Sequence, residues 1–233
     1  MKKLLIKLLT FCFATALVLS VFTGCGQPEY YTENLTYELI DGGRSFSVKG
    51  IGTATDTEIV IPSTYGGKPV TAISERAFEY EKNIMSVKIP SSVTEIGEWS
   101  FYYCTSMVSV EIANGVTDIN EGAFFGCSAL TSVTLPASVK NIGSIAFANC
   151  SNLENIQVSN GNPNFTSIDG NVYSKDGKVL VQYANGKKQD SFTLSNSVRV
   201  IGISAFRSCD NLKSVQASSV TEVGLARLKS ALL

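Results

Sequence analysis

The sequence has no histidine, and this absence removes a large part of enzyme chemistry. Without an imidazole there is no histidine general acid or base, and no Ser-His or Cys-His pair to activate a nucleophile. Zinc sites that use histidine are excluded for the same reason. The 233 residues also lack a Gly-rich phosphate-binding motif and a calcium loop of alternating aspartates. We therefore expect a protein that is not an enzyme and that has no cofactor and no metal.

Charge is sparse as well, because charged residues make up 17% of the chain and no block of basic residues occurs. Nucleic acid is therefore not an expected partner. Apolar residues account for 44%, a composition typical of a folded domain with no long disordered tract. What the sequence does contain is a targeting segment followed by a repeat.

Residues 1–24 are predicted to be a secretory signal peptide. Three lysines open the segment, and no further charge occurs before Glu29. The apolar stretch between them is typical of a secretory signal. It ends at Phe22-Thr23-Gly24-Cys25, which resembles the cleavage box of bacterial lipoproteins, with Cys25 as the acylated residue. The alternatives are a plain signal peptide or an uncleaved anchor, slightly short of the ~20 residues that span a bilayer.

Cleavage before Cys25 would leave a mildly acidic mature chain. It removes three of the 19 basic residues and no acids, so 16 basic residues stand against 20 acidic ones, a net charge of −4. Residues 25–34 are interpreted as a tether that spans only ~30 Å when fully extended. We therefore expect an extracytoplasmic domain, lipid-anchored to the bacterial membrane and facing outward.

A 23-residue repeat runs through the rest of the chain. Each repeat phenylalanine has an Ile five residues before it and an Ile, Met or Leu six residues after it. Such self-similarity indicates a solenoid, in which each unit buries its apolar side against its neighbours. The repeated dipeptides are Ala77-Phe78, Ser100-Phe101, Ala123-Phe124, Ala146-Phe147 and, after a longer interval, Ala205-Phe206.

Each unit is predicted to contain a short strand, a turn, a second short strand and a short helix, which makes the fold an α/β repeat solenoid. In one unit Val87 and Ile89 alternate with an outward Lys88, the period of a half-buried strand. Glu98 is expected to open a helical turn that carries Phe101, because an acid is favoured at a helix N-terminus.

Departures from the repeat predict loops and caps. The spacing widens near residues 65–69, which indicates an enlarged turn. Around 159–191 the helical module is replaced by a predicted β-hairpin with its turn at Lys175-Asp176-Gly177. Both ends need caps to cover an open apolar coil. The predicted boundaries are 35–58 for an N-terminal capping hairpin, 59–224 for the solenoid and 225–233 for a C-terminal capping helix.

Four of the six cysteines each lie three residues after a repeat phenylalanine. A shared register predicts a stacked column of buried, reduced thiols, since free cysteine behaves as a small apolar residue. A disulfide between neighbouring coils, ~4.8 Å apart, is the alternative. These four are Cys104, Cys127, Cys150 and Cys209.

The units SVKIPSSVTEIGEWSFYYCTSM and SVTLPASVKNIGSIAFANCSNL resemble the BspA-like branch of the leucine-rich repeats, found on bacterial cell surfaces. The stretch SIDGNVYSKDGKVLVQY is similar to an insert of the same family. The resemblance covers about residues 35–224. It implies a right-handed coil that mediates adhesion or protein–protein contact. The first unit departs from the pattern with Glu81 in place of the cysteine, and the last strand has Ala217 in place of the proline.

Outward residues of the first strands form one candidate binding surface. The resemblance implies that a curved sheet of this kind is the usual contact face, whereas a solvated face without a partner is the alternative. The column consists of Lys88, Glu111, Thr134, Gln157, Thr193 and Gln216.

Aromatic residues beside the repeat phenylalanines form a second candidate. Trp and Tyr anchor interfaces because they bury a large area with few rotors, and they also stack on sugar rings. Simple packing between coils is the alternative role. The proposed contact residues are Tyr80, Trp99, Tyr102, Tyr103 and Phe125.

Glu75, Glu98 and Glu121 recur at intervals of 23. Stacked carboxylates roughly 5 Å apart would approach the separation in a retaining glycosidase. Charge compensation at helix N-termini is the simpler explanation. The sequence thus predicts a monomeric surface protein that binds a protein, with glycan or cell-wall binding as the alternative and glycoside hydrolysis as a weaker one.

Overall fold

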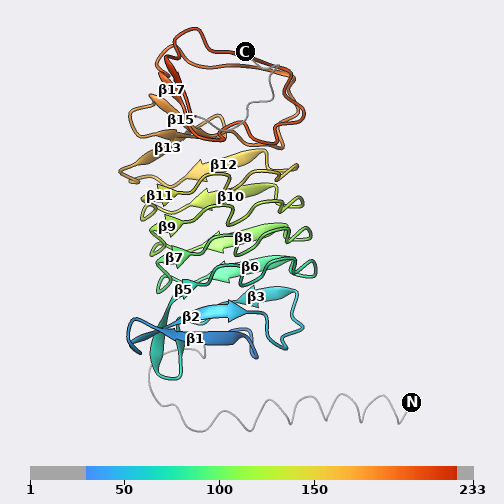
Figure 1. The fold of residues 1–233 in the computed structure, drawn as a ribbon, viewed down its shortest axis with the longest axis vertical. Coiled ribbons are helices and arrows are strands. Elements are labelled where there is room, and N and C mark those ends of the chain that lie inside the picture. Colours follow the sequence, from blue (N-terminus) through green and yellow to red (C-terminus); the bar gives the residue numbers. More distant parts are fainter. Residues whose placement is uncertain (1–29, 225–233) are drawn as a thin grey trace, which may run out of the picture.

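The computed structural model describes residues 30–224, and these form an elongated stack of coils (Figure 1). Strands lie across the long axis of the stack, and most coils contribute one strand to each of two sides. No α-helix occurs among the described residues, so the prediction of short helices is wrong and the solenoid is built from strands and turns. Accordingly, residues 30–224 contain no helix that could span a membrane. The expected signal peptide, Cys25 and the C-terminal cap at 225–233 lie outside the described residues.

The first strands of the coils lie in parallel on one side. They pair in separate groups, and the residues that pair across β6 and β8 are 23 positions apart, as Val87 and Val110 show. This confirms that equal positions of the repeat lie on top of one another. The first strands are β3 (Glu58–Val60), β6 (Ser86–Ile89) and β8 (Ser109–Ile112), then β10 (Ser132–Leu135) and β12 (Asn155–Val158), then β16 (Ser191–Thr193) and β18 (Ser214–Gln216).

The second strands form a longer parallel ladder on the adjoining side. Ile96 pairs with Ile119, again at an interval of 23. The ladder is interrupted between β11 and β15, where the insertion enters. Its strands are β2 (Ser45–Gly50), β5 (Lys68–Ile73), β7 (Glu95–Ile96), β9 (Asp118–Ile119) and β11 (Asn141–Ile142), followed by β15 (Val179–Gln182), β17 (Val200–Ile201) and β19 (Glu222–Val223).

The third side, where helices were expected, is a stack of turns joined from coil to coil. Alternate backbone N–H groups donate to the next coil: Phe101 N to Ala123 O at 2.8 Å and Tyr103 N to Phe125 O at 2.8 Å. The intervening N–H groups donate three residues back, as Tyr102 N does to Trp99 O at 3.0 Å. An α-helix needs bonds four residues back. Because the neighbouring coil supplies half of the acceptors, the backbone N–H groups of this segment are paired without the hydrogen bonds of a helix.

Backbone conformation on this side repeats every four residues. Trp99 and Tyr103 have φ near +54°, and the same two positions of the next coil are Gly122 and Gly126, at +61° and +76°. Glycine adopts a positive φ without a steric cost, whereas other residues do so rarely. Turns therefore replace the helix, and the positive φ that they require costs conformational energy. That cost is lower in the coil that has Gly122 and Gly126 at these positions.

Phenylalanine rings form a continuous ladder in the core. Their centroids are 5.1 to 5.4 Å apart and their planes lie within 4° of parallel. Phe206, the fifth repeat phenylalanine, lies outside this ladder. Its ring centroid is 5.3 Å from that of Tyr183 and 6.2 Å from that of Phe192. The ladder consists of Phe78, Phe101, Phe124 and Phe147.

The four repeat cysteines are buried and free, as predicted. Each thiol of the regular coils donates to the carbonyl oxygen of the phenylalanine in the preceding coil: Cys104 to Phe78 at 3.0 Å and Cys127 to Phe101 at 3.2 Å. Burial raises the pKa of the Cys104 thiol to about 12. These thiols are core residues and not nucleophiles.

The insertion contains the expected hairpin and one further strand. Strands β14 (Asn171–Ser174) and β15 pair antiparallel across a turn in which Gly177 has a φ of +69°. Strand β13 (Phe165–Ile168), which the sequence pattern did not reveal, pairs with the other side of β14. Because β15 also pairs in parallel with β17, the hairpin is part of the stack and does not simply project from it.

Two hairpins close the N-terminal end of the stack. Strand β1 (Thr36–Ile40) pairs antiparallel with β2. Strand β4 (Thr64–Tyr65) pairs with the start of β5 across Gly66 and Gly67, both at positive φ, which is the requirement of a type I′ turn. The enlarged turn expected near 65–69 is therefore a tight hairpin. Thr32 completes the end, because its N–H donates to Val60 O at 2.9 Å.

Candidate functional site

The five proposed aromatic residues form one continuous cluster on the turn side of the stack; we call Tyr80, Trp99, Tyr102, Tyr103 and Phe125 the aromatic cluster. Tyr102 lies at its centre, with ring centroids at 5.2 Å from Tyr80, 5.3 Å from Trp99, 4.6 Å from Tyr103 and 5.4 Å from Phe125. The residues come from three successive coils. The repeat brings them together because equal positions lie one coil apart.

The backbone of the turn side explains why these rings face outward. Phe101 and Cys104 of the same segment are fully buried, so Tyr102 and Tyr103 between them and Trp99 before them lie toward the surface. Trp99 lies directly over Gly122, where a Cβ would come within 2.3 Å of its ring, and Tyr103 lies over Gly126 at 3.0 Å. Glycine in one coil thus makes the space for an aromatic ring of the coil before it.

Packing and exposure coexist in the aromatic cluster. Tyr80 is 54% exposed, whereas the other four rings are half-buried against each other. The interpretation as packing between coils and the interpretation as a surface patch are therefore compatible. Tyr80 and Tyr103, in the same position of adjacent coils, stack with centroids 5.9 Å apart and planes at 19°.

Polar groups border the aromatic cluster. Arg76 forms ion pairs with Glu79 at 2.9 Å and with Glu75 at 3.3 Å. On the other border the Asn149 amide donates to the Tyr103 hydroxyl at 3.1 Å. Desolvation, together with a hydrogen bond to Tyr80, raises the pKa of Tyr102 above its ordinary value. An apolar centre with polar groups at its border is the common anatomy of a protein contact.

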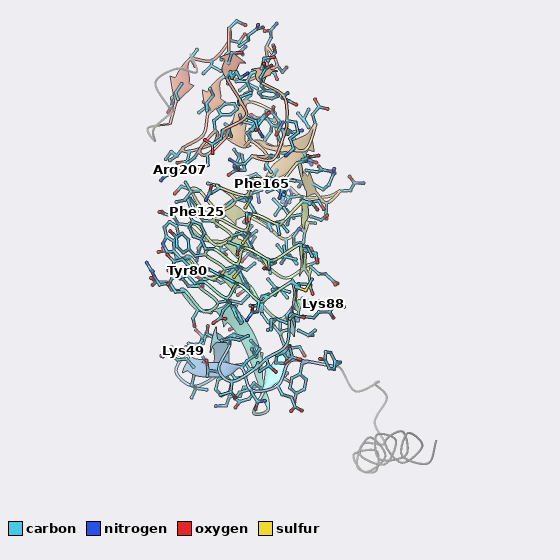
Figure 2. The ribbon with its side chains drawn as sticks, turned by 90° about the vertical axis from the view of Figure 1, so that its right-hand side faces the viewer. Lys49, Tyr80, Lys88, Phe125, Phe165 and Arg207 are labelled. Carbon is cyan, nitrogen blue, oxygen red and sulfur yellow. The ribbon has the colours of Figure 1, made fainter. Side chains whose placement is uncertain are left out.

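The polar column of the first strands lies on the opposite side of the stack. Figure 2 shows Lys88 on the side away from Tyr80 and Phe125. Its first four members are exposed and in register: Lys88 pairs with Glu111, and Thr134 with Gln157. Hydrogen-bonded pairing of the first strands is interrupted between β8 and β10, so these four residues do not lie on one continuous sheet. The column and the aromatic cluster are therefore two separate surfaces.

The three glutamates of the column are exposed, and side-chain partners hold two of them. Glu75 pairs with Arg76, and Glu121 accepts a hydrogen bond from Ser144 Oγ at 3.2 Å. Glu75 and Glu98 border an open depression of about 370 Å³, which Asn120 also lines. Within residues 30–224 no group of three or more acidic or cysteine side chains is placed to hold a metal ion. The contacts of these glutamates give the glycosidase alternative no support.

A ladder of polar side chains runs beside the depression and was missed in the sequence. The Asn120 amide donates to Glu95 at 2.7 Å, and the Asn141 amide donates to Asp118 at 2.6 Å. Hydrogen bonds from Thr117 and Asn141 hold the pKa of Asp118 below its usual value. The signal was available, because Glu95, Asp118 and Asn141 recur at intervals of 23.

Stacked coils with two parallel strand ladders and a 23-residue register define a solenoid of the leucine-rich-repeat class. The family model described as the BspA type leucine rich repeat region matches residues 57–180 and 181–229 in six copies. The match covers more than half of the chain, and the protein belongs to this family. None of the functionally curated proteins compared with the chain matches it.

Several solved structures share the fold. The pneumococcal vaccine antigen PcpA aligns with 81% of this chain at 24% identity and a TM-score of 0.64. This chain spans only 50% of that structure. A leucine rich cell surface protein from Faecalibacterium prausnitzii aligns with 86% of this chain and 74% of its own at 22% identity, with a TM-score of 0.53. A leucine rich repeat protein of T. pallidum covers 85% of this chain and 82% of its own at 25% identity, with a TM-score of 0.51.

Proposed function

We propose that this protein is exported, lipid-anchored at Cys25 and binds another protein at the cell surface through the aromatic cluster. The observation that carries the proposal is the continuity of five aromatic rings across three coils with Tyr80 largely exposed. Large rigid rings bury area at a low entropy cost, so they are the residues on which binding energy concentrates. Family membership supports a binding role, and the relative described as a cell surface protein supports the location.

Tyr80→Asn is the sharpest test of the binding surface. Asparagine tolerates the positive φ of Tyr80, so the change removes the exposed ring without adding backbone strain. We expect capture of a protein partner from surface extracts, identified by mass spectrometry, to fall at least tenfold while the thermal unfolding midpoint stays within a few degrees. Lys88→Asn on the opposite side is the matched control and should bind like the wild type. Equal capture by wild type and Tyr80→Asn would contradict the proposed contact.

Carbohydrate binding is the second candidate, because exposed aromatic rings also stack on sugars. A glycan array separates the two classes. Binding to a defined glycan that is lost with Tyr80→Asn would favour carbohydrate binding over binding of a protein partner.

Lipid anchoring is tested separately from binding. Cells that express the full chain are grown with an alkyne-labelled fatty acid, and we expect the label on the wild type and none on Cys25→Ala. A labelled Cys25→Ala protein, or an unlabelled wild type, would contradict the anchor.

A further inference from the structure

Exposed apolar side chains concentrate at the N-terminal end of the stack. Nine large apolar side chains are strongly exposed among residues 30–224, and four of them belong to this end. Their exposed fractions run from 44% for Tyr65 to 68% for Tyr30. We call Tyr30, Tyr31, Leu39 and Tyr65 the end patch.

Contacts within the N-terminal cap hold Tyr65 of the end patch in place. Tyr65, on the tight turn between β4 and β5, stacks on Tyr37 of β1 with ring centroids 3.8 Å apart and planes at 15°. It also meets Phe46 of β2 edge to face at 5.1 Å. Desolvation, followed by smaller contributions from Tyr65 and Tyr31, raises the pKa of Tyr37 to about 12. Tyr65 of the end patch is therefore supported by packed aromatic rings, and the Tyr30 hydroxyl donates to Asp56 Oδ1 at 3.5 Å.

The end patch lies at the extreme of the stack. β1 is the terminal strand of its sheet, in the order β1-β2-β5-β7 (Figure 1). At ~4.8 Å per strand, β7 is roughly 14 Å further along. The aromatic cluster begins with Tyr80, which follows β5 at roughly 10 Å from β1, and Trp99 belongs to the coil of β7, so the two apolar surfaces are separated along the axis.

The short tether limits how far the N-terminal end of the stack can lie from the membrane. Tyr30 is five residues after Cys25, and five extended residues reach only ~17 Å. A chain acylated at Cys25 therefore cannot hold its N-terminal end far from the headgroup region. This step depends on the lipid anchor proposed above.

The chemistry of the end patch matches a lipid headgroup layer. Tyrosine has an apolar ring and a polar hydroxyl, and it is enriched where membrane meets water. Charges around the end patch are mixed: Glu38 pairs with Lys49 at 3.1 Å, and Asp41 and Arg44 lie in the turn between β1 and β2. A surface without an excess of positive charge gains little from anionic lipid. Aromatic contact, and not electrostatic attraction, would hold it.

We propose that the end patch rests on the lipid headgroup surface, so that the solenoid stands upright on the membrane with its aromatic cluster raised above it. The acyl group supplies the anchor, and the end patch sets the orientation. A tethered domain with a polar end would instead tumble.

Tryptophan quenching tests the orientation, because Trp99 is the only tryptophan of the chain. The full-length lipidated protein is reconstituted in phosphatidylcholine vesicles that contain brominated acyl chains. Tyr65→Trp in a Trp99→Phe background should show blue-shifted emission and at least twofold quenching. The wild type, which reports from Trp99, should be quenched by less than a tenth. Adding anionic lipid or salt should change neither value. Leu39→Trp in the same background replaces Tyr65→Trp if that variant does not fold.

The possible contrary results are distinct. Vesicle-bound protein whose tryptophan at 65 or 39 is unquenched would overturn the upright contact and leave the anchor standing. Wild-type protein that does not float with vesicles would overturn both. A blue shift without quenching, together with a dimer mass by light scattering, would show that a second copy covers the end patch, which also overturns the proposal.

Discussion

The coils before and after the insertion carry the same repeat but pack differently. From Phe78 to Phe147 four rings stack nearly parallel at 5.1 to 5.4 Å. Beyond the insertion Phe206 meets Tyr183 at an angle of 42°. The buried apolar residues accordingly fall into two clusters, and Val172 and Tyr173 of β14 mark the boundary between them. Identical sequence positions thus give identical packing only between coils that follow one another at the 23-residue interval.

The largest expected effect comes from removing a ring on each side of the insertion. Phe124→Ala deletes a fully buried ring with a stacked neighbour on each side and should lower the free energy of unfolding by about 4 kcal/mol. Phe206→Ala, where the ring is slightly exposed and tilted against its neighbours, should cost clearly less. Urea denaturation of both variants measures the difference. Equal losses would mean that the stacked ladder adds nothing to burial.

A smaller effect should separate packing from backbone strain on the turn side. Gly122→Ala places a Cβ 2.3 Å from the Trp99 ring at a φ of +61°, and we expect a loss of about 3 kcal/mol with a shift in Trp99 emission. Gly177→Ala in the hairpin has a φ of +69° and no atom closer than 4.0 Å. It should cost only about 1 kcal/mol and leave Trp99 emission unchanged. If both variants behave alike, the ring over Gly122 is not tightly packed.

The smallest effect is a pH dependence of stability from the buried thiols. Burial raises the pKa of Cys150 to about 12, and that of Cys127 well above its ordinary value. Because the folded pKa is raised, the contribution is complete below the unfolded pKa of ~8.5 and is lost as the pH rises toward the folded value.

Comparison of the wild type with Cys127→Ala isolates one thiol. Between pH 8.5 and 9.5 the wild type should lose about 1 kcal/mol more than the variant, as measured by urea denaturation at each pH. Parallel pH profiles would contradict the raised pKa in the folded protein. Ellman's reagent should react with the four cysteines only after unfolding.

Much of the fold could be predicted because the repeat is strict. Ile73, Ile96 and Ile119 occupy one position of the register and are all buried. The hairpin of the insertion and its Asp-Gly turn were also predictable from local turn chemistry. The helix was not excluded by the sequence, since an acid followed by apolar residues three apart also suits a helical turn. The sequence feature that argues against a helix is the pair Gly122 and Gly126. These glycines lie four residues apart, and both adopt a positive φ, as do Trp99 and Tyr103 at the same positions of the coil before.

The aromatic cluster was predictable as a set of neighbouring residues, but the way its rings pack was not. Register alone places Tyr80 beside Tyr103, yet the space for Trp99 depends on the missing side chain of Gly122 in the next coil. The end patch could not be predicted at all, because Tyr65 meets Tyr37 only after two hairpins fold over one another.

The sequence by itself determined a coil with a period of 23, an apolar interior and the column of thiols, since each follows from the spacing of residues along the chain. Tertiary structure decided that the third side is turns instead of helix and that strand β15 of the insertion enters the stack. The physical reason is that backbone N–H groups choose among acceptors, and the acceptors that won belong to neighbouring coils, which exist only once the chain has folded.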